Sequence, residues 1–122
     1  MKNDIPDRLR RFAVAVIKMS RKLDNSAEYK IIKNQLIKAA TSAGANYEES
    51  QGAASTPDFI NKVKISLKEM RESNYWLELL SQTIPHAERP AELDELIDES
   101  EQLKRILGSI CSKFSDNKNK KS

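Results

Sequence analysis

Residues 27–52, AEYKIIKNQLIKAATSAGANYEESQG, decide the fold class of this chain. Their apolar side chains recur at helical spacing and fall on one arc at about 100° per residue. Three alanines in this stripe allow close approach of a neighbouring helix. The stretch predicts a long amphipathic helix from Ala27 to Gln51, with Gly52 as its stop. The stripe consists of Tyr29, Ile32, Leu36, Ala39, Ala40, Ala43 and Tyr47.

The residues before this stretch predict a first helix that begins near Pro6, because Asp4 can cap it and proline fits its first turn. Asp24, Asn25 and Ser26 form a cluster of turn residues, and the Ser26 hydroxyl is expected to cap the second helix. The apolar arc of the first helix contains Leu9, Phe12, Ala13, Val16, Ile17 and Leu23.

The residues after Gly52 predict two further helices. Ser55 and Pro57 form a helix start, and the third helix extends from Pro57 to Ile84. The fourth helix starts at Pro90, with acidic first turns and basic last turns that suit the helix dipole. Its apolar arc contains Leu93, Leu96, Ile97, Leu103, Leu107, Cys111 and Phe114.

Four helices with short connections predict an all-α, antiparallel up-down-up-down four-helix bundle. It forms one domain, residues 1–114, followed by a basic flexible tail, residues 115–122. Three glycines and four prolines among 122 residues are too few for a chain of many short strands. No apolar run is long enough to span a bilayer, and one cysteine excludes an internal disulfide. A cytoplasmic protein with no membrane partner is expected.

The third helix carries a second apolar arc, roughly opposite the first. A helix in a monomeric bundle normally shows one stripe, so the second arc favours a contact with another copy of the chain. The alternative is a broad core face with Trp76 partly exposed. The predicted oligomer interface contains Ile65, Glu69, Glu72, Trp76, Leu79 and Leu80.

The net charge of +3 is unevenly distributed. Residues 1–38 contain ten Lys/Arg and four Asp/Glu, whereas residues 88–101 contain one Arg and seven acids. Four cations of the first helix lie on one arc. This pattern predicts contact with nucleic-acid phosphates that depends on salt but not on base sequence, and the lysines of the tail are expected to contribute to it. The alternatives are a solvated face or ion pairs with Asp94, Glu95, Asp98 and Glu99. The predicted nucleic-acid-binding residues are Arg8, Arg11, Lys18 and Lys22.

No catalytic site, metal site or cofactor site is predicted. Glu69 and Glu72 suggest a carboxylate-bridged metal, but such sites in bundles also need Glu-x-x-His pairs, and the single histidine, His86, lies in a loop. Cys111 falls inside an apolar arc and is expected to pack in the core. Asn46 and Glu49 form either a ligand-binding pair or, as we favour, structural polar contacts between helices. An enzyme is therefore not predicted.

The second and third helices resemble the bacterial four helix bundle protein family, first found as reading frames within intervening sequences of large-subunit ribosomal RNA genes. The resemblance lies in KAATSAGANYEESQG, residues 38–52, which contains the family-motif residues Asn46, Glu49 and Gly52. Weaker matches to the family are Arg11-Phe12-Ala13, Asp58-Phe59-Ile60, Glu69, Glu72 and Tyr75-Trp76-Leu77. Gly44 and Ser50 depart from the family, which usually has proline and glycine at these positions.

The resemblance implies a bundle that assembles as a homopentameric ring, but it implies no biochemical activity for the ribosomal-intervening branch. A distant branch, the accessory proteins of diversity-generating retroelements, forms a basic barrel that contacts nucleic acid and a reverse transcriptase. The sequence thus favours a non-enzymatic, self-assembling binding or scaffold module for RNA or a nucleoprotein. The alternative is a protein–protein interaction module with no role in nucleic-acid binding.

Overall fold

The structure is a computed structural model that describes the backbone of residues 4–121 and the side chains of residues 4–114. Within this range the chain forms four α-helices, one short 3₁₀ helix and no strand, which confirms the predicted all-α class. The elements are α1 (Ile5–Ser20), α2 (Ala27–Gln51), α3 (Thr56–Thr83), η1 (His86–Glu88) and α4 (Ala91–Lys121).

The starts of α1 and α3 are capped by the side chains of Asp4 and Ser55. The Asp4 carboxylate accepts a hydrogen bond from the Asp7 N–H at 3.4 Å, and the Ser55 hydroxyl oxygen accepts one from the Asp58 N–H at 3.2 Å. The start of α2 differs. Ser26 occupies the cap position, but its buried hydroxyl forms no hydrogen bond with any described group, so the predicted side-chain cap is wrong.

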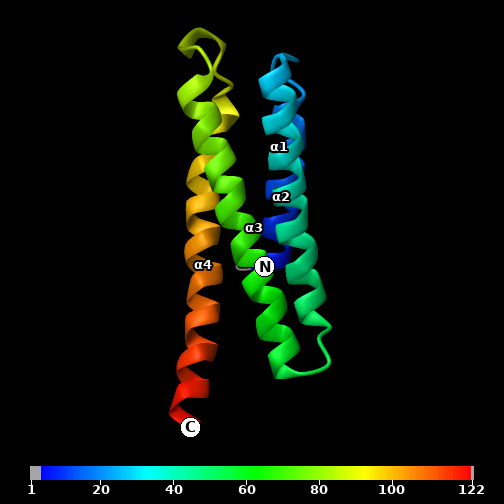
Figure 1. Ribbon diagram of the computed structural model, residues 1–122, viewed down its shortest axis with the longest axis vertical. Coiled ribbons are helices and arrows are strands. Elements are labelled where there is room, and N and C mark those ends of the chain that lie inside the picture. Colours follow the sequence, from blue (N-terminus) through cyan, green and yellow to red (C-terminus); the bar gives the residue numbers. More distant parts are fainter. Residues whose placement is uncertain (1–3, 122) are drawn as a thin grey trace.

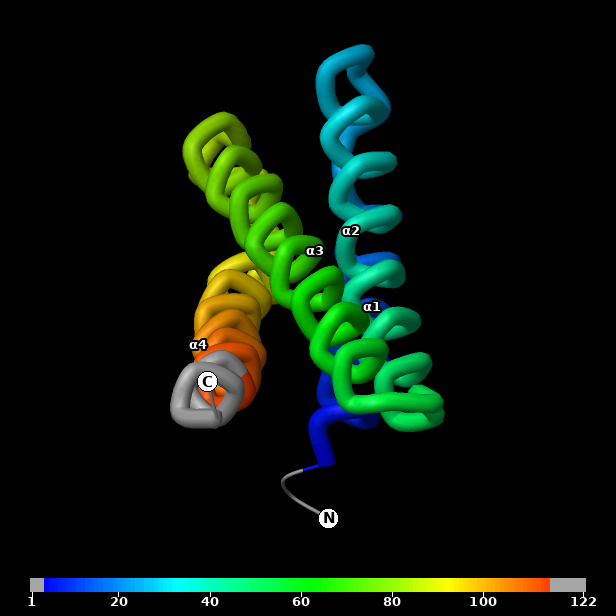
Figure 2. The backbone as a smooth tube through the Cα atoms, turned by 60° about the horizontal axis from the view of Figure 1, so that its bottom comes forward, coloured from blue at the N-terminus to red at the C-terminus, as the bar shows by residue number. Residues whose placement is uncertain are grey.

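Consecutive helices are antiparallel and joined by short connections (Figure 1). Each helix packs against two others, in the order α1–α2–α3–α4–α1, as in an up-down-up-down bundle. The contact between α2 and α3 is the most extensive, and that between α1 and α4 is the smallest. Figure 2 shows that α2 and α3 diverge toward the start of α2 and the end of α3.

The core is formed by the predicted apolar arcs. Ala39, Ala40 and Ala43 are almost wholly buried, which places α2 close to its neighbours. The Ser66 hydroxyl of α3 donates a 2.7 Å hydrogen bond to the Ala43 carbonyl of α2. Burial of this set of side chains supplies the main force for folding. The largest wholly buried apolar side chains include Leu9, Leu36, Met70, Leu77, Leu93, Leu103 and Leu107.

One buried side-chain hydrogen bond connects the second half of α3 with α4. The Asn74 amide donates to the Ser100 hydroxyl at 2.8 Å, and the Ser100 hydroxyl donates to the Ile97 carbonyl at 2.8 Å. Because unpaired buried polar groups are costly, this chain of bonds favours one register between the two helices.

Residues 115–122, predicted as a basic flexible tail, lie outside the described side chains, so that prediction and the role of the tail lysines stay open. Among the described residues, no helix has the length and apolar character needed to cross a membrane.

Gly44 tests how closely α1 and α2 approach. A Cβ at this position would lie 3.7 Å from the Leu9 Cβ, which is ordinary van der Waals contact. We expect Gly44→Ala to raise the free energy of unfolding by up to about 1 kcal/mol, because alanine favours the helix more than glycine does. Urea denaturation followed by circular dichroism measures the change.

Gly108→Ala is the matched control, since a Cβ there would meet no described atom within 4 Å. An increase in its free energy of unfolding would reflect helix propensity alone. A loss of stability in Gly44→Ala beside a gain in Gly108→Ala would contradict the expectation and place a steric limit at the α1–α2 contact.

Candidate nucleic-acid interface

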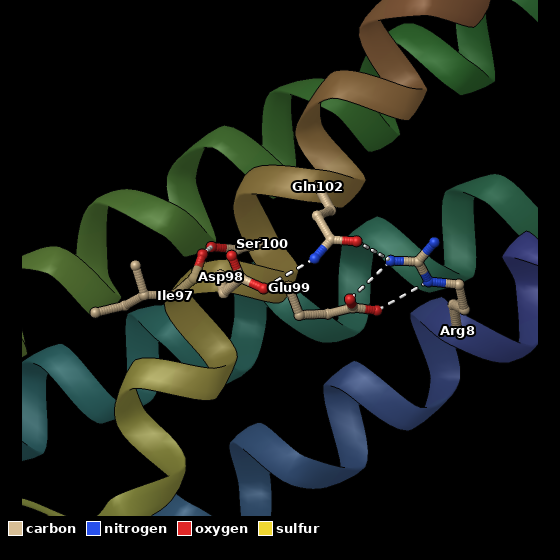
Figure 3. A network of polar contacts seen from close by, with 6 residues as sticks. All are labelled: Arg8, Ile97, Asp98, Glu99, Ser100 and Gln102. Atoms are coloured by element: carbon tan, nitrogen blue, oxygen red, sulfur yellow. Dashed lines mark hydrogen bonds and ion pairs between the residues drawn. The ribbon is translucent and has the colours of Figure 1, made fainter.

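Arg8, predicted to bind nucleic acid, forms an ion pair with Glu99 of α4. Its guanidinium donates to both Glu99 carboxylate oxygens, at 3.0 Å from Nε and 2.7 Å from Nη2 (Figure 3). Nη2 also lies 3.3 Å from Gln102 Oε1, and the Gln102 amide donates to Asp98. The Arg8 side chain is only 20% exposed, and the hydrogen bond with Glu99 raises the pKa of Arg8. A phosphate would have to displace Glu99 to reach it.

Two of the other predicted cations also have carboxylate partners. Lys22 pairs with Glu92 of α4, and this hydrogen bond lowers the pKa of Glu92. Arg11 lies 3.2 Å from the Asp7 carboxylate one turn earlier in α1. Lys18 is exposed and has no ion pair with any described side chain.

The four residues therefore lie on one helix, but they do not form an uninterrupted cationic surface. The groove between α1 and α4, about 470 Å³ in volume, is lined by Arg8 and Arg11 and also by Glu95 and Glu99. Mixed charges of this kind weaken the attraction for a polyanion. Of the acids expected to compete, Glu99 pairs with Arg8, whereas Lys22 pairs with Glu92, which was not among those expected.

A second set of cations, which the sequence prediction did not include, lies on α3. Lys64, Lys68 and Arg71 are exposed, and we call them the α3 basic row. Their spacing of i, i+4 and i+7 places them within about 60° of arc on the helix. None of them has an ion pair with a carboxylate among residues 4–114. The same spacing is visible in the sequence and is the signal that locates the row.

Two residues of the row, Lys64 and Arg71, lie close enough to α4 for their charges to act on Cys111. Burial raises the pKa of the Cys111 thiol of α4, and the positive charges of Lys64 and Arg71 partly oppose this shift. Cys111 is therefore a protonated packing residue, not an activated nucleophile. Tyr75, one turn beyond Arg71, extends the row and is 56% exposed.

The predicted oligomer interface needs one correction. Leu80 is 0% exposed and belongs to the core of the single chain, so it is unavailable to a second copy. Ile65, Glu69, Glu72, Trp76 and Leu79 are partly buried, and Trp76 and Leu79 also pack against the core. The Trp76 indole N–H donates to the Glu72 carboxylate at 3.2 Å, which gives this glutamate a partner within its own helix.

Of the family-motif residues, Asn46 makes polar contacts within α2 and Glu49 makes one between α2 and α3. The Asn46 amide donates to the Ser42 carbonyl at 2.9 Å and to its hydroxyl at 3.1 Å. Glu49 pairs with Lys62 of α3 at 2.7 Å, and this hydrogen bond raises the pKa of Lys62. Gly52 is the residue at which α2 ends.

The described residues contain no group of three or more His, Cys, Asp or Glu side chains that could hold a metal ion. His86 is exposed in η1. Exposed cations lie on several helices of the described surface, and on α3 three of them share one line with the exposed ring of Tyr75.

Comparisons with known proteins identify the family. The family model described as "23S rRNA-intervening sequence protein" matches residues 1–109. A solved structure of a protein of unknown function from the S23 ribosomal protein family, from Bacteroides thetaiotaomicron VPI-5482, is 34% identical, with a TM-score of 0.75. The alignment covers 88% of this chain and 97% of that one. A comparison with curated proteins gives no match. The chain belongs to the 23S rRNA-intervening sequence protein family.

Proposed function

We propose that this protein is a non-enzymatic, self-associating helical bundle that binds RNA in the cytoplasm and acts as a scaffold or binding module. The observation that carries the proposal is the α3 basic row, three exposed cations with no carboxylate partner among residues 4–114. The family name refers to an intervening sequence of 23S rRNA, which makes RNA the first nucleic acid to test.

The ion pairs decide which cations are available. A phosphate that binds Arg8 or Lys22 competes with Glu99 or Glu92 for the same cation. A phosphate that binds the α3 basic row has no carboxylate among residues 4–114 to displace. Release of counterions from the phosphates then supplies the favourable free energy. The row is therefore a better phosphate-binding surface than the α1 residues predicted from the sequence.

Self-association would multiply this weak contact. Three cations per chain give modest affinity, but several copies linked in one assembly raise the effective concentration of every further contact. The partly buried apolar side chains of Ile65, Trp76 and Leu79 support such an assembly. The pentamer implied by the family resemblance is part of this proposal.

The test is RNA binding over a salt series, measured by fluorescence anisotropy with a labelled hairpin that carries a single-stranded overhang. Neutralising three phosphates of a single strand corresponds to a slope of about −2 in log K against log salt, or about 20-fold weaker binding at 200 mM than at 50 mM salt. The variant Lys64→Gln/Lys68→Gln/Arg71→Gln should lose this dependence and most of the affinity.

A matched control removes equal charge from the α1 stripe, in the variant Arg8→Gln/Arg11→Gln/Lys22→Gln. It should retain most of the binding, because these residues already have carboxylate partners. If the control variant lost most of its RNA affinity and the α3 variant lost none, the RNA-binding surface would be α1 and not α3. No binding by the wild-type protein at low salt would refute the RNA proposal.

The alternative is a protein–protein interaction module without RNA binding. The partly buried arc of α3 around Trp76 favours it, since a partly exposed indole next to apolar side chains is typical of protein contacts. Absence of RNA binding together with a stable complex at this arc would support the alternative.

A further inference from the structure

Tyr75 is an exposed aromatic side chain at the end of a cationic row. It is 56% exposed, and it continues the α3 basic row at the position i+11 from Lys64. At about 1.5 Å per residue, the distance along α3 from Lys64 to Tyr75 is about 16 Å. Four side chains suited to phosphates and to an aromatic partner therefore follow one line on the surface of one helix.

Neighbouring side chains restrict the Tyr75 ring. Its centroid lies 5.0 Å from that of Trp76, and the two rings are inclined by 74° in an edge-to-face contact. The Trp76 indole is in turn held by its hydrogen bond with Glu72. A ring positioned by such contacts loses less conformational entropy when it binds a partner than a freely rotating one.

Cations combined with an exposed aromatic ring favour one class of ligand. Phosphates of any nucleic acid can contact Lys64, Lys68 and Arg71, but only an unpaired base exposes a face on which an aromatic ring can stack. In a duplex the base faces are covered by neighbouring base pairs. At about 3.4 Å per stacked nucleotide, a distance of about 16 Å corresponds to four or five nucleotides.

We propose that Lys64, Lys68, Arg71 and Tyr75 form a binding site for an unpaired segment of four or five nucleotides, in which the cations contact the backbone and Tyr75 stacks on one base. The proposal rests on the proposed RNA-binding function and adds to it a preference for single-stranded over duplex RNA. It assigns Tyr75 as the residue responsible for that preference.

The test compares an unstructured 12-nucleotide RNA with a duplex of equal length, by fluorescence anisotropy at constant salt. The wild-type protein should bind the single strand more tightly. Tyr75→Ala should weaken single-strand binding about fivefold or more, as expected for the loss of one stacked base, and should leave duplex binding unchanged. Tyr75→Phe should retain the preference, because stacking requires the ring and not the hydroxyl.

A matched control and a direct signal accompany these variants. Ile31→Ala truncates another exposed apolar side chain, 62% exposed on α2, and should not change binding. Trp76 is the single tryptophan of the chain, so its fluorescence should respond when a base stacks on the adjacent Tyr75. This response should disappear in Tyr75→Ala, while circular dichroism checks that the fold is kept.

The outcomes separate the two proposals. Equal affinity for single strand and duplex, with no effect of Tyr75→Ala, would overturn the stacking site and leave the RNA-binding proposal standing. No binding of either RNA by the wild-type protein would overturn both. A single-strand preference lost in Tyr75→Ala and kept in Tyr75→Phe supports the site.

Discussion

Replacing Leu80 with alanine should lower the free energy of unfolding by about 2–5 kcal/mol, the range for truncation of a buried leucine. Leu80 is 0% exposed, so the substitution removes buried apolar surface and leaves a cavity that the neighbouring helices fill only in part. Urea or guanidinium denaturation followed by circular dichroism measures the loss.

Leu79→Ala is the matched control for this experiment. Leu79 is the preceding residue and lies only partly buried at the edge of the core, so its truncation should be less destabilising. Leu80→Ala should also leave the oligomeric state unchanged wherever the protein remains folded. If Leu80→Ala dissociated an oligomer without lowering the stability of the chain, Leu80 would belong to the interface and not to the core.

Replacing Trp76 with glutamate should break the proposed assembly into smaller species. Trp76 lies partly buried on the arc of α3 that was predicted to meet another copy. A carboxylate there would lose its hydration in the contact without gaining a partner, and interface centres are sensitive to such changes. Multi-angle light scattering should give an oligomer for the wild-type protein, a pentamer according to the family resemblance, and a lower mass for Trp76→Glu.

A second variant separates assembly from folding, because Trp76 also packs against the core. Ile65→Glu places a charge on the same arc, at a partly buried position closer to the start of α3, and should reduce the mass as well. Ile31→Glu, on the exposed surface of α2, is the control and should leave the mass unchanged. A monomeric wild-type protein at micromolar concentration would contradict the assembly proposal.

The helices were predictable because their signals are local. The period of apolar residues and the stop at Gly52 predicted α2 with its observed bounds, Ala27–Gln51. The prediction of a side-chain cap at Ser26 was wrong. A serine at a cap position is a sequence property, whereas the hydrogen bond depends on the side-chain orientation and its surroundings, and here the hydroxyl is buried without a described partner.

Leu80 illustrates the limit of assigning faces from periodicity. At about 100° per residue, Leu80 lies about 40° from Trp76 and about 60° from Leu77, between the two apolar arcs of α3. Helical angle alone therefore assigns it to the second arc, as predicted. Packing of the neighbouring helices decides that Leu80 joins Leu77 in the core while Trp76 remains partly exposed.

The candidate site was predictable in its chemistry but not in its position. The sequence contains both cationic sets, and helical spacing brings each set to one side of its helix. What distinguishes them is the presence of carboxylates. Arg8 and Glu99 are separated by 91 residues, and their contact exists only because α1 packs beside α4.

The sequence by itself thus determined the all-α class, the places of the four helices along the chain and most of the core, since helix caps, stops and apolar periods act between residues a few positions apart. It did not fix every helix end, because Leu23 was predicted on the arc of the first helix and α1 ends at Ser20. The tertiary structure alone decided that Arg8 and Lys22 have carboxylate partners on another helix. Ion pairs such as Arg8–Glu99 and Lys22–Glu92 join surfaces of different helices, whereas the α3 basic row has no described carboxylate within ion-pair distance. Charge pairing depends on distances between helices, and these distances are set by packing.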